Sequence, residues 1–204
     1  MNLDIYEDAE RLAKRYGTRD PFELLDAMNV VVKFTDKFPK DGLKGFCTFM
    51  NKTKYVVIND RLSSIEARVV AGHEAGHIIR HATELKVGAF QDNDIYMATG
   101  KKEREANVFA ADFLIRDDDV LELMQSCDSN FFNVSKALRI PAPFFAFKLY
   151  SMVERGHAMR MPVDLDSTFL ARKRCSRMKE EPRLARCLVR LVKGCYLTTN
   201  QKNP

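Results

Sequence analysis

Hydrophobic and polar positions follow a helical period at the start of the chain and a strand-like pattern soon after. Residues 4–16 carry apolar side chains on one helical face and end at Gly17, and an Asp-Pro pair precedes a second helical stretch that runs to residue 28. Three later runs, NVVVKF, KGFCTFM and KYVVIN, are rich in β-branched and aromatic residues and predict strands. The polar pair Asn51-Lys52 separates the last two runs, which predicts a hairpin.

Helical spacing dominates the rest of the chain. A long helix is predicted over about 63–81, with Asp60 or Ser63 as its N-cap, and two more over about 101–115 and 117–126. The stretch between the first two of these helices lacks a clear period and predicts a long loop.

Two further helices are predicted after residue 130. The stretches FNVSKALRI and PAPFFAFKLYSMVERG carry them, with breaks at Pro141 and Pro143. The whole pattern predicts an α+β fold, in which a small, mostly antiparallel sheet packs on a helical body with C-terminal helices.

The composition is that of an ordinary globular protein, with 46% hydrophobic and 30% charged residues among 204. No apolar run approaches the roughly 18 residues of a membrane span, and the N-terminus lacks an apolar signal core. The five cysteines form no CxxC pair, which fits a reducing compartment. We expect a cytoplasmic protein without a membrane partner.

The charge is uneven along the chain. Residues 171–204 hold ten Lys or Arg against two acids, about +8, whereas the remaining residues hold 23 against 26, about −3. The tail can form a basic amphipathic helix, and a solvated helix face is the preferred interpretation over a DNA or membrane contact. Its only aromatic residue is Tyr196, so direct sequence-specific DNA binding is not expected.

The predicted helix over 63–81 contains the sequence His73-Glu74-Ala-Gly76-His77. Residues four apart on a helix share a face, so two imidazoles there can bind one metal ion, and Glu74 lies beside them as a candidate general base. Glycine at position 76 lowers the stability of the helix, and a close approach by another element would explain why it is present there. The alternative is a helix with two ordinary histidines. His81 lies one turn further on and is expected to support the site or cap the helix.

Two histidines form an incomplete zinc site, so a third ligand is needed. The helix predicted over 101–115 offers Glu103 and Glu105. Glu103 shares a face with small and apolar residues that allow close helix packing, so it is preferred over Glu105. Asn107 lies one turn after Glu103 and could hydrogen-bond a ligand imidazole from behind.

The two motif helices, RVVAGHEAGHIIRH and EREANVFAADFLI, resemble those of the ImmA/IrrE family of metallo-endopeptidases. The resemblance covers about residues 5–125. It implies a zincin-like fold with one Zn²⁺ per chain, held by His73, His77 and Glu103. It implies that Glu74 is the general base.

The same resemblance implies a substrate, because ImmA- and IrrE-like proteins cut helix-turn-helix repressors of mobile elements or stress genes. We expect a peptidase domain over 1–155 and a basic C-terminal extension of unknown role over 156–204. Ligand chemistry favours zinc, although Mn²⁺ or Fe²⁺ could occupy the same site. The sequence leaves the oligomeric state open.

Other expectations concern the reaction. Tyr96, His157 and Tyr150 are weak candidates for the group that stabilises the oxyanion, with Tyr150 more consistent with the core. The strand KYVVIN could present an edge to an extended peptide or lie inside the sheet. The alternative function is a non-catalytic module that sequesters a repressor or antitoxin, and Glu74 argues against it because a binding site needs no base.

Overall fold

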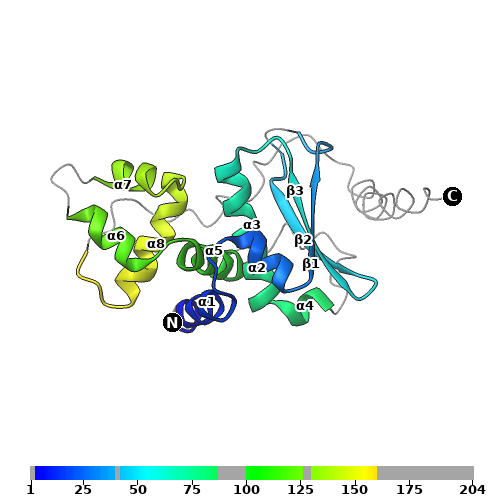
Figure 1. Cartoon of the computed structure of the whole chain (residues 1–204), viewed down its shortest axis with the longest axis horizontal. Helices are drawn as coiled ribbons and strands as arrows, with labels where there is room; N and C mark the ends of the chain where they lie inside the picture. The colour runs from blue at the N-terminus through cyan, green and yellow to red at the C-terminus, as the bar shows by residue number, and fades with distance from the viewer. Residues whose placement is uncertain (1–2, 40–41, 87–99, 126–129, 160–204) are drawn as a thin grey trace.

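The computed structural model of the chain describes residues 3–39, 42–86, 100–125 and 130–159. In chain order the elements are α1 (Leu3–Tyr16), α2 (Pro21–Ala27), β1 (Val30–Thr35), β2 (Gly45–Met50), β3 (Thr53–Asn59), α3 (Ser64–Arg80), α4 (Ala82–Lys86), α5 (Lys101–Leu114), α6 (Asp117–Met124), α7 (Phe131–Ala137) and α8 (Ala142–Glu154). Helix α5 lies in the middle of the molecule, with α3 and the sheet on one side and α6, α7 and α8 on the other (Figure 1). The predicted α+β fold is confirmed.

The sheet has the strand order β1-β3-β2. Strands β2 and β3 form the predicted antiparallel hairpin, and Asn51 and Lys52 both adopt positive φ, as a tight two-residue turn requires. Strand β1 pairs with the other side of β3 in parallel, so the sheet is mixed rather than mostly antiparallel. The run KYVVIN is therefore the central strand, and the idea that it presents a free edge is wrong.

The two faces of the sheet bury different clusters. Cys47, Val56 and Ile58 belong to the main hydrophobic core, on the face that packs against α3. On the opposite face, Phe46 and Val57 form a small separate cluster with residues of the segment between β1 and β2. Both faces of the hairpin are thus partly buried, which explains its long apolar runs.

Capping residues fix where the helices begin. Ser63 caps α3 in a reciprocal capping box with Glu66, so Ser63 rather than Asp60 has this role. Asp20 caps α2 by accepting from two backbone N–H groups, as predicted. Pro141 is the N-cap of α8 and separates it from α7, as expected. Pro143 lies in the first turn of α8, where no N–H is needed, so it does not break the helix.

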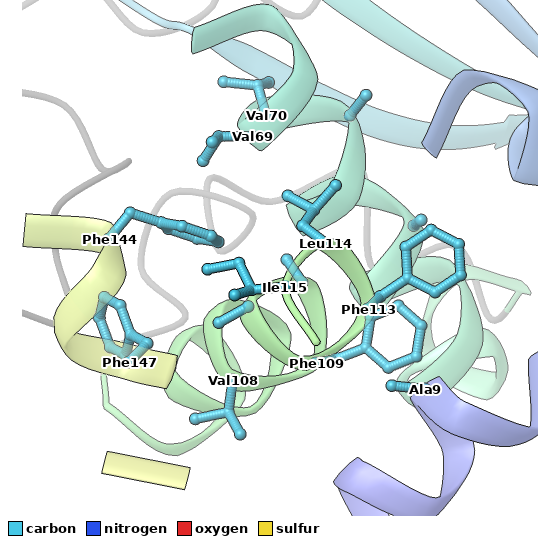
Figure 2. Packing of buried hydrophobic residues seen from close by; sticks show 14 of the residues in the cluster. Ala9, Val69, Val70, Val108, Phe109, Phe113, Leu114, Ile115, Phe144 and Phe147 are labelled. Carbon is cyan, nitrogen blue, oxygen red and sulfur yellow. The ribbon is translucent and has the colours of Figure 1, made fainter. Parts of the chain in front are cut away.

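The core is built around α5. Phe109 and Phe113 stack on one side of this helix near Ala9 of α1, while Phe144 and Phe147 approach from α8 (Figure 2). Every residue of α5 from Ala106 to Leu114 is buried. Burial of this kind contributes roughly 1.5–3 kcal/mol per large apolar side chain. Among the described helices, none is long and apolar enough to cross a membrane.

A buried ionic network joins the C-terminal half of α5 to α6 and α8. Lys148 Nζ lies 2.9 Å from Asp112 Oδ1 and 2.6 Å from Asp117 Oδ1, and both Lys148 and Asp112 are fully buried. Ser151 Oγ donates to Asp112 at 2.6 Å, and Arg155 donates to both oxygens of Asp117 at 2.6 and 2.9 Å. Charges buried in this way are tolerated because each has several partners.

Stability at low pH should depend on Asp117. Burial tends to raise its pKa, but hydrogen bonds from Arg155 and Lys148 and their charges lower the pKa to about 2, from 3.8. A carboxylate with a lowered pKa stabilises the fold above pH 4 and loses that contribution as pH falls towards 2. We expect urea unfolding to show a weaker loss of stability between pH 4 and 2 in Asp117→Asn than in the wild type. The exposed Asp118→Asn should retain the full loss; an identical slope in all three proteins would contradict the assignment.

Candidate metal centre

The candidate site depends on a close contact between α3 and α5. A Cβ atom added at Gly76 would lie 3.0 Å from both the Cα and the carbonyl oxygen of Ala106, and 3.2 Å from Phe109 Cδ1. Backbone atoms cannot rotate away from such a contact, so glycine is needed here. The sequence interpretation of Gly76 as a residue of close approach fits this geometry.

This contact brings together the three proposed ligands. His73 Nε2 lies 3.3 Å from Glu103 Oε2, His77 Nε2 lies 3.2 Å from Glu103 Oε1, and the two Nε2 atoms are 3.0 Å apart. In the described part of the chain, these residues form a group of metal-ligand type whose donor atoms all lie within 4.8 Å of one another. Two ligands of a tetrahedral zinc with bonds of about 2.1 Å are roughly 3.4 Å apart. The donor set and its spacing therefore fit one zinc ion.

The electrostatics of Glu103 agree with this fit. Burial tends to raise its pKa, but the hydrogen bonds and charges of His73 and His77 outweigh burial and hold the pKa well below its usual range. Its side chain is 16% exposed, so the carboxylate is largely removed from water. A carboxylate beside two imidazoles in this setting is well suited to a cation.

Asn107 orients the first histidine. Its Oδ1 lies 2.9 Å from His73 Nδ1, and Asn107 is fully buried. When Nδ1 carries the proton and donates to this oxygen, the lone pair of Nε2 points towards Glu103 and His77. The structure thus places Asn107 against the imidazole of His73, and its role behind a metal ligand stays a prediction.

Glu74 lies on α3 between the histidines and is only 6% exposed. Burial raises its pKa to about 7, while the charge of His77 and hydrogen bonds from Cys47 partly offset that effect. The contact with β2, the strand that carries Cys47, could not be predicted from the sequence because strand order was unknown. A β-branched and aromatic run gives no sign of which of its residues will face a carboxylate.

Glu105, His157 and Tyr150 lie apart from this group, whereas the ring of His81 lies 5.6 Å from the ring of His77, centroid to centroid. Glu105 Oε2 is 3.8 Å from His81 Nε2 and its Oε1 is 3.7 Å from Lys101, and His81 is the C-cap of α3. His157 Nε2 lies 3.6 Å from Asp117 in the ionic network. Tyr150 packs against the main core. Tyr96 lies outside the described residues.

Comparison with known proteins assigns the chain to a family. A family model described as the IrrE N-terminal-like domain (Peptidase_M78) matches residues 25–150, which include the whole of α3 and α5. The chain is also similar to "Uncharacterized immunity region protein 2" of Bacillus phage phi105, with 32% identity over 108 residues. That match covers 53% of this chain and 66% of the phage protein. The chain belongs to the IrrE N-terminal-like peptidase family, which confirms the resemblance found in the two motif helices.

The close contact at Gly76 can be tested by substitution. Gly→Ala in a helix normally stabilises a protein by about 1 kcal/mol. At Gly76 we expect the opposite sign, a loss of roughly 1–3 kcal/mol in the free energy of unfolding, because the added methyl group forces the backbones of α3 and α5 apart. Urea unfolding followed by circular dichroism measures this change.

Gly72→Ala is the matched control on the same helix. An added Cβ there is 3.3 Å from the terminal Leu114 Cδ1 and 3.4 Å from the Cβ of Ala110, so side-chain adjustment relieves most of the contact. Equal effects at Gly72 and Gly76 would show that the crossing does not depend on glycine at position 76.

Proposed function

We propose that this protein is a zinc-dependent endopeptidase in which His73, His77 and Glu103 hold one zinc ion per chain. The observation that carries the proposal is the spacing of their donor atoms, 3.0 to 3.3 Å. Glu105 is set aside because it faces His81 and Lys101. Two imidazoles and one carboxylate leave a fourth position open, which is the arrangement of catalytic rather than structural zinc sites.

Zinc bound there would act as a Lewis acid on the scissile carbonyl and on the attacking water. Glu74 is the proposed general base. One of its carboxylate oxygens accepts a proton from that water and delivers it to the nitrogen of the leaving amine. Asn107 keeps the His73 ring in the tautomer that directs Nε2 to the site. Tyr96 stays a candidate for oxyanion stabilisation, and His157 does not, because it faces Asp117.

An extended substrate could pair with β2, which is an edge of the three-stranded sheet. Asn59 N donates to Lys44 O, so Lys44 directs its backbone groups towards β3. Residues alternate along an antiparallel strand, so Gly45 and Cys47 direct theirs towards the outer edge, where the backbone groups of Gly45 and the carbonyl of Cys47 are the ones proposed to pair with a peptide. Strand addition gives affinity through main-chain hydrogen bonds and fits a peptide substrate.

The proposed substrate is a helix-turn-helix repressor of a mobile element or stress response, cut in the cytoplasm. Membership of a peptidase family supports hydrolysis of a protein. The name of the phage relative, an immunity region protein, supports a link to repressor control. The oligomeric state does not enter the proposal.

Zinc content of purified variants tests the ligands. We expect near one zinc per wild-type chain, most of it lost in His77→Ala and Glu103→Ala because removal of one of three protein ligands leaves an incomplete site. Glu74→Gln and the matched Glu105→Ala should keep their zinc. If the wild type stays metal-free after incubation with excess zinc, the zinc proposal fails; if only Glu105→Ala loses the ion, the third ligand is misassigned.

Cleavage of a purified helix-turn-helix repressor tests the reaction, with products identified by mass spectrometry. We expect Glu74→Gln to keep zinc and to cut about 10²- to 10⁴-fold more slowly, because the general base is lost. If Glu74→Gln still relieves repression as well as the wild type, the protein acts by sequestering its partner, and the peptidase proposal is replaced by the binding-module alternative.

A further inference from the structure

Strand β2 forms a wall against α3 at the level of Glu74. A Cβ atom added at Gly45 would collide with Val70 Cγ1, and it would lie 3.6 Å from Glu74 Oε1. The absence of a side chain at Gly45 thus allows the backbone of β2 to approach the carboxylate closely. Helix α3 is therefore held between two glycine contacts, Gly76 against α5 on one side and Gly45 against β2 on the other.

Cys47 lies two residues further along β2 and shares the face of Gly45. Side chains alternate along a strand, so Gly45 and Cys47 both face α3, and Cys47 is buried in the main core at 4% exposure. Its backbone N–H is directed to the outer edge of β2 and is not used to pair with β3. Cys47 can therefore offer Glu74 two donors, the N–H and the thiol.

We propose that Cys47 is a positioning residue for Glu74. The backbone N–H and the thiol of Cys47 hold the carboxylate of Glu74 in place beside the three metal ligands. The inference deepens the proposed function, because a general base is useful only when its oxygen is fixed near the attacking water. A glutamate has three rotatable bonds, so a buried carboxylate such as that of Glu74 keeps a single position only where contacts restrict its side chain.

The chemistry of the thiol fits a donor rather than a ligand or nucleophile. Burial and the nearby charge of Glu74 raise the pKa of Cys47 well above its usual value, so the sulfur keeps its proton. The metal-ligand group found among the described residues does not include Cys47. A neutral S–H beside a carboxylate can donate to it, and hydrogen bonds to charged groups are stronger than those between neutral groups.

A double-mutant cycle tests the contact without any substrate. The variants are Cys47→Val, Glu74→Leu and their combination, each loaded with zinc and checked for equal metal content, with urea unfolding as the measurement. Valine keeps the side-chain volume approximately and removes the thiol donor, and leucine removes the acceptor. We expect the two effects to be non-additive by about five- to tenfold in the unfolding equilibrium constant.

Two further variants separate donation from packing. Serine keeps a donor, so Cys47→Ser should preserve the interaction with Glu74 and its effect should be nearly additive with that of Glu74→Leu. Alanine removes the donor, so Cys47→Ala should be as non-additive with Glu74→Leu as Cys47→Val is. If the effects of Cys47→Val and Glu74→Leu are additive, or if valine preserves the interaction with Glu74 and serine removes it, Cys47 only fills space and the proposal is overturned.

Cleavage kinetics provide the functional readout. With a cleaved repressor in hand, Cys47→Val should lower kcat by about tenfold with KM nearly unchanged, and Cys47→Ser should recover most of the loss. A larger effect on KM than on kcat would contradict a positioning role. If the wild type cleaves no protein while the cycle shows coupling, the peptidase proposal fails and the contact between Cys47 and Glu74 stands.

Discussion

The packing of α3 on α5 at Gly76 is the constraint on which the rest of the site depends. The three proposed ligands come from two helices that are separated in sequence, and their donor atoms meet only because two backbones touch at Ala106. A helix pair normally lies 8–10 Å apart, at a distance set by the side chains at the contact. Glycine on one helix and alanine on the other allow the two backbones to approach closely, and His73, His77 and Glu103 then face one another.

Polar groups inside this core are arranged in two separate networks. Near the start of α5, the histidines, Glu103 and Asn107 satisfy one another at 2.9 to 3.3 Å. Near its end, Asp112 is held by Lys148 and Ser151 of α8. Burial of a charge is costly unless it is paired, and both networks meet that condition. The difference lies in their composition, since the first contains three metal-type donors with room for a cation and the second already contains its cations.

The sequence predicted local features well and long-range ones poorly. The cap at Ser63, one of the two candidates, the turn at Asn51-Lys52 and the helix that carries Glu103 depend on neighbours in the chain, and each is found in the structure. The parallel pairing of β1 with β3 was not predicted, because the sequence of an apolar strand does not indicate which strands are its neighbours in the sheet. That error hid the edge role of β2, and with it the contact between Cys47 and Glu74. The roles of the site residues in metal binding and catalysis stay predictions.

The anchoring of α5 at both ends bears on how the metal would bind. Asp112 ties the C-terminal half of the helix to α8, and Ala106 fixes its N-terminal half against α3, with buried aromatic side chains between them. Because these contacts are made by protein groups alone, the positions of Glu103 and Asn107 do not require a metal ion to define them. A site held in this way would lose little conformational freedom on binding, so the interaction of zinc with the three proposed ligands would not be offset by the cost of ordering a helix. The same rigidity applies to Glu74, which is fixed on α3 between α5 and β2. The fold therefore supplies the geometry that the proposed general base and the proposed metal would share, and that geometry follows from the packing that surrounds the site.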